Sequence, residues 1–262
     1  MKVGILAGGR GTRLMSGGEA PPKALYEIGG MPIVWHIMQM YAVAGFREFV
    51  MLLGYKAQQI VDYFVHRLPF EGRDVSLTLD DTITRQFLTP GYHQSPWQII
   101  LCHTGLTAEK GERIRRMRTY VADDENFMVT YGDGVADIDL RRLVAFHLEH
   151  GKIATLAAVR SRSQFGHVDI TGSGQVTEMR ENPMLPGWIN GGFFVFRREI
   201  FNWLEKDDTL ETGCFRRLAA AGELMAYCHE GFWTCMDTYK DNLRLNELWE
   251  RNNAPWAVWR VD

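Results

Sequence analysis

The residues best suited to do chemistry lie in a glycine-rich stretch near the start of the chain. Residues 6–14 read LAGGRGTRL, follow a short apolar run, and are followed by Pro22 and Lys23. Glycines after a strand let backbone N–H groups approach an oxyanion closely. Arg13 can hold a phosphate with two parallel hydrogen bonds, and Lys23 can add a compact positive charge. The stretch therefore predicts a polyphosphate site, with a glycine-rich turn whose Arg13 and Lys23 face solvent as the alternative.

Two well-known phosphate-binding motifs do not match this stretch. The dinucleotide fingerprint of dehydrogenases needs a third glycine where Leu14 stands. A P-loop needs a Gly-Lys-Ser or Gly-Lys-Thr sequence, which residues 6–14 lack. A dehydrogenase and a P-loop NTPase are thus disfavoured.

Two distant aspartates form the second candidate constellation. Asp133 stands between two glycines directly after the apolar run 127–131, and Asp237 lies among apolar neighbours in the sequence WTCMDT. Open α/β sheets bind ligands at the carboxyl ends of their strands, where Asp133 is expected. Mg²⁺ takes one or two protein carboxylates and completes its shell with phosphate and water. We therefore expect Asp133 and Asp237 to hold Mg²⁺, with a turn for Asp133 and a helix N-cap or structural ion pair for Asp237 as alternatives.

A third group of residues is suited to reading a sugar. Asn190 lies in the sequence WINGGFF, with Glu181 upstream and Gly166 before that. Asparagine and glutamate bind hydroxyl groups well, and glycines let a ring lie near the backbone. The alternative reading of Asn190 and its two glycines is a tight turn.

The elements that must position these residues alternate along the chain. Short apolar runs at 2–6, 49–53, 127–131 and 153–159 predict buried strands, and helical spacing at 33–44, 58–65 and 140–150 predicts helices between them. Exposed strands are expected at 75–79 and 98–104, and further short strands at 176–180, 193–196 and 224–228. A final helix is predicted over 241–252. This pattern indicates an α/β fold built on βαβ units, with one continuous sheet shared by both halves of the chain.

Composition limits the partners and the compartment. The 262 residues carry 29 Lys+Arg and 32 Asp+Glu, which is not the clustered basic excess of a nucleic-acid-binding protein. The N-terminus carries no signal peptide and no apolar run is long enough for a membrane span, so we expect no membrane partner. The four cysteines have neither zinc nor disulfide spacing, which favours reduced thiols in a cytoplasmic protein. His147 and His150 are expected on a solvated helix face.

Tryptophans gather towards the C-terminus, at Trp249, Trp256 and Trp259. Exposed aromatic side chains there would indicate a subunit interface, whereas buried ones would cap the core. The sequence alone leaves both readings open.

Taken together, these phrases resemble the sugar-1-phosphate nucleotidyltransferases, and within them the glucose-1-phosphate cytidylyltransferases. The resemblance is carried by residues 6–14, 22–23, 27–33, 35–38, 54–56, 130–134, 189–194, 236–238 and 254–256, in that order. It implies a Rossmann-like, mixed but mostly parallel central sheet flanked by helices, with a smaller strand-rich region for acceptor binding and assembly. It also implies CTP as donor, Mg²⁺ as cofactor, CDP-glucose as product and a homo-oligomer.

The resemblance assigns roles to particular residues. It implies one domain over residues 1–262, with a nucleotide-binding half up to about residue 135 and an acceptor-binding and oligomerisation half after it. The nucleotide would be bound by Leu6, Ala7, Gly8, Gly9, Gly11, Thr12, Arg13, Lys23, Gly105 and Asp133. Arg13 and Lys23 would be catalytic, Asp133 and Asp237 would carry the metal, and Gly166, Glu181 and Asn190 would face the sugar.

Three positions depart from the family pattern. Asn182 stands where the family usually has the lysine of Glu-Lys-Pro, Pro21 replaces a lysine before Lys23, and Leu106 follows Gly105 where an acidic residue is expected. Losing two cations beside phosphates would cost roughly a few kcal/mol of transition-state stabilisation unless another group compensates. Lys240 is the substitute that the sequence offers.

The expected reaction is transfer of CMP from CTP to a sugar 1-phosphate. A phosphate dianion is already a nucleophile near neutral pH, which fits a sequence with no Ser/His/Asp or Cys/His set. One alternative is a cytidylyltransferase whose acceptor is another phosphorylated compound or a phosphonate, and the change at Asn182 favours it. The other is a non-catalytic subunit that binds a nucleotide sugar, which the presence of Arg13, Lys23, Asp133 and Asp237 together disfavours.

Overall fold

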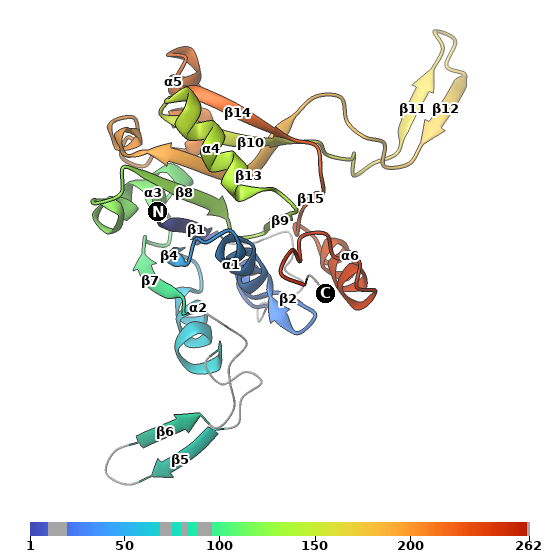
Figure 1. Cartoon of the computed structure of the whole chain (residues 1–262). Helices are drawn as coiled ribbons and strands as arrows, with labels where there is room; N and C mark the ends of the chain where they lie inside the picture. The colour runs from blue at the N-terminus through green and yellow to red at the C-terminus, as the bar shows by residue number, and fades with distance from the viewer. Residues whose placement is uncertain (10–19, 69–74, 80–82, 88–95, 261–262) are drawn as a thin grey trace.

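A seven-stranded sheet forms the centre of the molecule. In the computed structural model, residues 1–9, 20–68, 75–79, 83–87 and 96–260 are described (Figure 1). Across the sheet the strands are β14 (Leu224–His229), β10 (Ala154–Val159), β13 (Ile189–Arg197), β8 (Asn126–Tyr131), β1 (Val3–Ala7), β4 (Glu48–Leu53) and β7 (Gln98–His103). Within this sheet β13 runs antiparallel to both of its neighbours and the other pairings are parallel. The predicted mixed, mostly parallel sheet is therefore confirmed, and both halves of the chain contribute strands to it.

The strands are apolar on both faces because helices cover both faces. Alternate residues of β4 enter different cores: Phe49, Met51 and Leu53 join one buried cluster, and Val50 and Leu52 join the other. This alternation follows from the two-residue period of a strand. A sheet buried on two sides gives the continuous apolar runs that predicted buried strands from the sequence.

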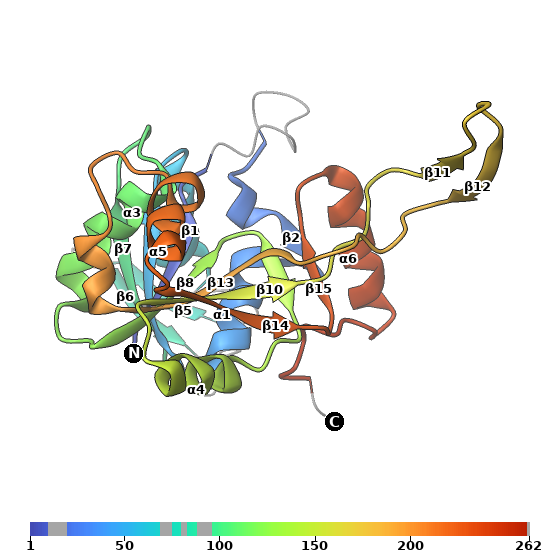
Figure 2. The same ribbon diagram turned by 90° about the horizontal axis from the view of Figure 1, so that it is seen from above.

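The helices form the outer layers (Figures 1 and 2). Helices α1 (Ile33–Val43) and α4 (Leu140–His150) place side chains in the first cluster, and α3 (Lys110–Arg116) and α5 (Phe215–Ala220) place theirs in the second. The remaining helical segments of the described residues are η1 (Lys23–Leu25), α2 (Ala57–Asp62), η2 (Tyr63–Arg67), η4 (Met117–Val121), η5 (Arg198–Asn202), η6 (Leu210–Cys214) and α6 (Tyr239–Glu250). The predicted helices at 33–44, 58–65, 140–150 and 241–252 correspond to α1, α2 with η2, α4 and α6. None of the helices in the described parts of the chain is long and apolar enough to cross a membrane.

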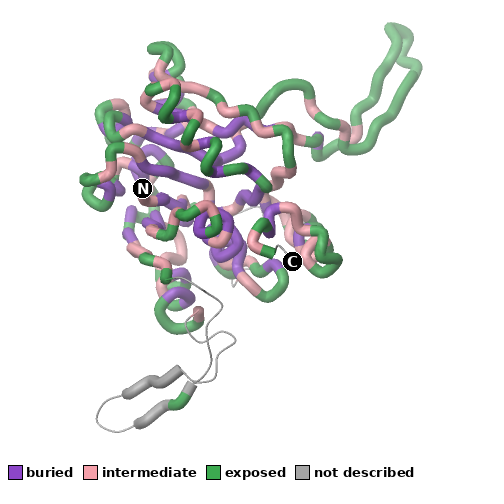
Figure 3. The backbone as a smooth tube through the Cα atoms, viewed as in Figure 1, coloured by how far each residue is buried: buried purple, intermediate pink, exposed green. Residues whose placement is uncertain are grey.

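Four two-stranded sheets accompany the central one. They are β2 (Glu27–Ile28) with β3 (Met31–Pro32), β5 (Val75–Leu79) with β6 (Ile83–Phe87), β9 (Gly134–Ala136) with β15 (Trp233–Cys235), and β11 (His167–Ile170) with β12 (Val176–Arg180). The β11–β12 hairpin projects away from the body of the molecule, and every residue of its strands is exposed (Figures 1 and 3).

The C-terminal tryptophans pack against α1. Trp256 is fully buried and donates from its indole nitrogen to His36 Nδ1 at 3.3 Å. Trp249 and Trp259 are partly buried beside the same imidazole ring. Of the two readings of this cluster, the structure therefore shows that these side chains cap the core.

His147 corrects the prediction of a solvated histidine pair. His150 is partly exposed, but His147 is buried between α4 and the sheet, with Nδ1 2.8 Å from Thr155 Oγ1 and Nε2 3.2 Å from Asn126 Oδ1. The sequence shows polar residues at both positions but not the strand that covers one of them. Burial lowers the pKa of His147 from 6.5 to about 4, with smaller contributions of the same sign from His150 and Arg197.

This buried imidazole predicts a pH-dependent stability. Its folded-state pKa of about 4 lies below 6.5, so the unfolded chain binds more protons between these values and stability falls as the pH drops. Between pH 7.5 and pH 5, wild type should lose about 2 kcal/mol more unfolding free energy than His147→Gln. Urea unfolding at the two pH values measures this difference. His36 has a similarly lowered pKa but is present in both proteins, so its contribution cancels. Equal losses in the two proteins would contradict the prediction.

Candidate active site

Two carboxylates from distant parts of the chain converge on one ammonium group. Lys23 Nζ lies 2.6 Å from Asp133 Oδ2 and 2.5 Å from Asp237 Oδ1. All three side chains are largely shielded, with 16%, 26% and 28% of Lys23, Asp133 and Asp237 exposed. The structure thus brings together three of the predicted site residues across more than 200 positions of sequence.

A short ladder places the two aspartates side by side. Asp133 lies between β8 and β9, and Asp237 follows β15, which pairs with β9 so that Cys235 stands opposite Gly134. The amide of Met236 also donates to the carbonyl of Asp133 at 2.9 Å. The N-cap of α6 is Thr238, in a capping box with Asp241, so the alternative that Asp237 is the helix cap is wrong. Asp237 instead forms the ion pair that was the other alternative.

The electrostatics of Lys23 follow from these partners. Burial lowers the pKa of the Lys23 ammonium, but the charges and hydrogen bonds of Asp133 and Asp237 outweigh it and raise the pKa above 10.5. Lys23 is therefore a cation at neutral pH, held within reach of both carboxylates. Such a group is suited to bind a phosphate that approaches the same place.

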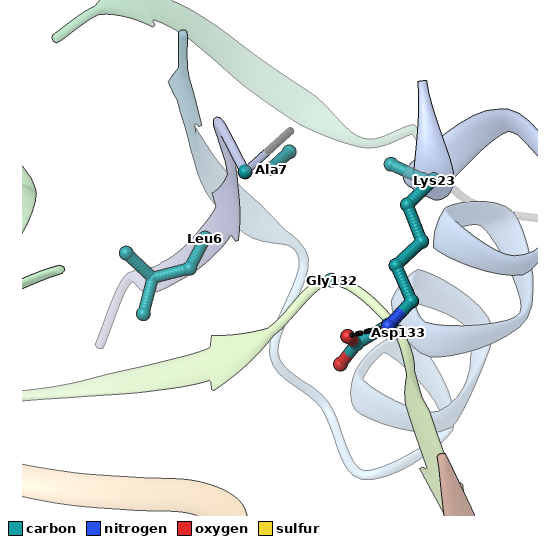
Figure 4. Close-up of a pocket in the computed structure, with 7 residues that line it drawn as sticks. Leu6, Ala7, Lys23, Gly132 and Asp133 are labelled. Atoms are coloured by element: carbon teal, nitrogen blue, oxygen red, sulfur yellow. Dashed lines mark ion pairs between the residues drawn. The ribbon is translucent and has the colours of Figure 1, made fainter. Parts of the chain in front are cut away.

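A pocket opens beside this ion pair at the carboxyl edge of the sheet (Figure 4). Its volume is about 170 Å³. The lining residues come from the ends of β1 and β8 and from η1: Leu6, Ala7, Gly9, Lys23, Ala24, Gly132 and Asp133. Figure 4 shows the Lys23 side chain reaching across to the Asp133 carboxylate at one side of this pocket. The location is the edge at which open α/β sheets bind ligands.

Arg113 is a contributor that sequence reasoning missed. It is 5% exposed, and its guanidinium donates to the carbonyls of Gly8 at 3.1 Å, Leu53 at 3.1 Å and Gly105 at 3.0 Å, and to Thr104 Oγ1 at 2.5 Å. These acceptors lie just beyond or at the carboxyl ends of β1, β4 and β7. A Cβ at Gly8 would overlap the Arg113 guanidinium, so any larger residue there would displace this side chain from its acceptors. In the sequence Arg113 is one of three arginines in KGERIRR, and only the helical packing of α3 distinguishes it.

The residues expected to face the sugar fall into two places. Asn190 lies at the start of β13, and its Nδ2 donates to the Tyr131 hydroxyl at 3.1 Å, two residues before Asp133. Gly166 and Glu181 lie against each other, since a Cβ on Gly166 would be 3.0 Å from Glu181 Oε1. That second pair stands beside the ends of the β11–β12 hairpin.

The remaining predicted residues have simpler placements. Gly11, Thr12 and Arg13 lie outside the described residues. Gly105 follows β7 next to Arg113, and Leu106 after it is 55% exposed. Lys240 is exposed in the first turn of α6. Beside Asn182, Arg162 donates to the Asn182 carbonyl at 3.2 Å.

The similarity of this chain to known proteins agrees with the geometry of the site. The family model described as nucleotidyl transferase matches residues 2–251, which is nearly the whole chain. The chain belongs to the nucleotidyl transferase family. Among relatives of this nucleotidyl transferase, the glucose-1-phosphate cytidylyltransferase of Salmonella typhimurium is 43% identical over 99% of this chain and 100% of its own length. A Bacillus subtilis relative named a probable glucose-1-phosphate cytidylyltransferase is 40% identical, again over 99% and 100%.

Solved structures show the same fold at lower identity. HddC from Yersinia pseudotuberculosis superposes with a TM-score of 0.65 and 21% identity, covering 95% of this chain and 99% of that one. The inositol-1-phosphate CTP transferase from T. maritima gives a TM-score of 0.64 and 16% identity, covering 98% and 97%. The nucleotidyl transferase therefore shares its architecture with these proteins over almost its full length.

Arg113 provides a test of how the strand ends are held. Arg113→Met should lower the unfolding free energy by about 3 kcal/mol, because four hydrogen bonds from one buried guanidinium are lost together. Urea unfolding of the variant measures the loss. Arg142→Met is the matched control, since it makes the same change of side chain at an arginine that is 80% exposed and paired only with the exposed Asp139 among the described residues. A loss of the same size in both variants would show that Arg113 has no special place in the fold.

Proposed function

We propose that this chain transfers CMP from CTP to glucose 1-phosphate and forms CDP-glucose and pyrophosphate. The observation that carries the proposal is the convergence of Asp133 and Asp237 on Lys23 beside the glycine-rich strand end, at the ligand-binding edge of the sheet. Support for CTP and glucose 1-phosphate as substrates comes from the full-length similarity to the cytidylyltransferases of Salmonella typhimurium and Bacillus subtilis. No catalytic serine or cysteine set is needed for this reaction.

The proposed chemistry is an in-line displacement at the α-phosphorus of CTP. A phosphate oxygen of glucose 1-phosphate forms a bond to the α-phosphorus, and the bond from that phosphorus to the β-phosphate oxygen breaks, so that pyrophosphate leaves. The attacking phosphate is already anionic at neutral pH, so a general base is not required. The residues of the chain would act by positioning and by neutralising charge, with Lys23 and Arg13 as the cations.

The donor set at Asp133 and Asp237 fits a divalent ion. Both carboxylates direct an oxygen at the same point, where the ammonium of Lys23 now lies. Mg²⁺ is bound by one or two carboxylates together with phosphate oxygens and water. We propose that Asp133 and Asp237 hold Mg²⁺ with the triphosphate, which would offset the phosphate charge. Lys23 is then free to pair with phosphate.

The other proposed contacts follow from placement and from the family pattern. Leu6, Ala7, Gly8, Gly9, Gly11, Thr12 and Arg13 would hold the nucleotide phosphates, and Gly105 would lie near the base. Asn190, Glu181 and Gly166 would face the sugar, with Lys240 as a cation near the acceptor phosphate.

A different phosphorylated acceptor, or a phosphonate, is the second candidate substrate. Asn182 has no charge where the family usually has a lysine, and its φ of 47° places it in the left-handed region that asparagine tolerates. The neighbouring guanidinium of Arg162 donates to the Asn182 carbonyl, and it differs in reach and shape from the ammonium of a lysine. These two features alter the surroundings in which an acceptor phosphate would be recognised.

We further propose that the chain is a homo-oligomer in the cytoplasm. An isolated two-stranded hairpin is marginal in water, and β11–β12 exposes Ile170 by 67% and Met179 by 65%. A second copy packed on the hairpin would cover these side chains. Sedimentation as a monomer at micromolar concentration would contradict this part of the proposal. The four cysteines are free thiols, as suits a reducing compartment.

A matrix of four NTPs against several acceptors tests the reaction itself. With Mg²⁺ present, pyrophosphate release is measured for glucose 1-phosphate, other sugar 1-phosphates and small phosphonates. CTP with glucose 1-phosphate should give the highest kcat/KM. Turnover of CTP with another acceptor but not with glucose 1-phosphate would select the second candidate. Absence of pyrophosphate release in every combination would reject the enzymatic proposal.

The metal assignment gives a sharper prediction. Asp133→Asn and Asp237→Asn should each lower kcat by on the order of 100-fold or more, because each removes a charged ligand for the metal and triphosphate. Chelation of the metal from wild type should likewise stop pyrophosphate release, and added Mg²⁺ should restore it. Asp123→Asn is the control, an exposed aspartate that precedes β8 and so lies at the opposite end of this strand from Asp133. Wild-type turnover in either site variant would remove Asp133 or Asp237 from the metal site.

A further inference from the structure

Four side chains form a connected polar network that begins two residues before Asp133. Lys110 comes from the start of α3, Glu211 from η6, Tyr131 from the end of β8 and Asn190 from the start of β13. The Tyr131 hydroxyl is the centre: it donates to the Glu211 carboxylate and accepts from Asn190 Nδ2 at 3.1 Å. The network thus joins the strand that leads to Asp133 with a residue proposed to face the sugar.

The direction of the Tyr131 hydroxyl proton constrains the orientation of the Asn190 amide. A phenol has a single proton, and a carboxylate can only accept, so the Tyr131 proton points at Glu211. The Tyr131 oxygen then offers only lone pairs to Asn190, which must present its NH₂ group. At the other end, Asn190 Oδ1 accepts from the Gly192 amide at 2.9 Å. Turning the amide over would place acceptor against acceptor at Tyr131 and donor against donor at Gly192, so Glu211 and the Gly192 amide together select one of its two orientations.

Lys110 stabilises the ionised form of Glu211. Its ammonium binds the Glu211 carboxylate and lies 4.6 Å from the centre of the Tyr131 ring. Burial raises the pKa of Glu211, but the hydrogen bonds from Lys110 and Tyr131 outweigh it and the pKa lies below its ordinary value. Glu211 is therefore an acceptor throughout the neutral range.

The backbone around Asn190 is held from both sides. Gly192 has a φ of +80°, and a Cβ there would come within 2.5 Å of the Tyr131 ring, so only glycine lets the ring pack so closely. Trp233 donates from Nε1 to the carbonyl of Gly191 at 2.8 Å. Trp233 begins the strand that leads to Asp237, so the segment 190–192 is braced by the two strands that deliver the aspartates.

The locked amide keeps one free donor and one free acceptor. Of the two N–H bonds and two lone pairs of Asn190, the network uses one of each. A sugar hydroxyl can accept a hydrogen bond from the free N–H of Asn190 and donate one to its free lone pair. We propose that Glu211, acting through the Tyr131 hydroxyl, is a positioning residue that holds the Asn190 amide in this orientation together with the Gly192 amide, and thereby raises the affinity for the sugar of the acceptor. This inference rests on the proposed transfer to glucose 1-phosphate.

Steady-state kinetics of Tyr131→Phe and Glu211→Gln test the inference. Phenylalanine keeps the packing on Gly192 but removes the hydroxyl, and glutamine can donate to the hydroxyl and reverse its proton. Each variant should raise KM for glucose 1-phosphate roughly tenfold, as expected for one lost hydrogen bond, and change KM for CTP less than about twofold. In an Asn190→Ala background, the same two changes should alter KM for glucose 1-phosphate by less than about twofold, because their effect passes through Asn190.

The matched control is Glu199→Gln, which alters a glutamate paired with Arg197 at the opposite edge of the sheet. It should leave both KM values unchanged. Equal rises in KM for CTP and for glucose 1-phosphate, or full additivity with Asn190→Ala, would overturn the inference while wild-type turnover leaves the proposed function in place. A wild type that is inactive with glucose 1-phosphate would overturn both, which is a distinguishable result.

Discussion

The constraint on which this site depends is the approach of two like charges. Asp133 and Asp237 each carry a carboxylate into a partly shielded place, where neither is stable without a cation between them. Lys23 supplies that cation from a third part of the chain. The turn between β8 and β9, the end of β15 and the short helix η1 must therefore meet at one point, and the sheet order provides the frame in which they do.

The frame is secured by a second buried cation with a different task. Arg113 offers its guanidinium to backbone carbonyls at the ends of β1, β4 and β7. Two of them, at Gly8 and Leu53, also accept a backbone amide, so Arg113 adds a further donor that ties the three strand ends together. It binds no phosphate in this arrangement. By fixing where β1 ends, it fixes where the glycine-rich stretch begins, and this links the fold to the pocket beside Lys23.

Much of this organisation could be predicted from the sequence, for reasons that differ between residues. The apolar runs of β1, β4, β8 and β10 are visible because both faces of the sheet are covered, and Gly-Asp-Gly after one of them marks a ligand edge. Asp133 and Asp237 were predicted to lie together only because two carboxylates suit a metal ion. No local pattern reveals that β9 pairs with β15. Arg113, Glu211 and the burial of His147 were missed because their partners are distant in sequence and their neighbours are ordinary charged helix residues.

Because β13 is antiparallel to β10, the segment between these two strands leaves and rejoins the sheet at the same edge. After β10 the chain leaves the sheet at the ligand edge, forms the β11–β12 hairpin, and returns at that same edge through β13. The excursion is thus an insertion with a shared point of departure and return. Its length and surface can change in evolution without shifting the register of any core strand. The hairpin can therefore diversify in such a protein while the pocket beside Lys23 and Asp133 stays the same.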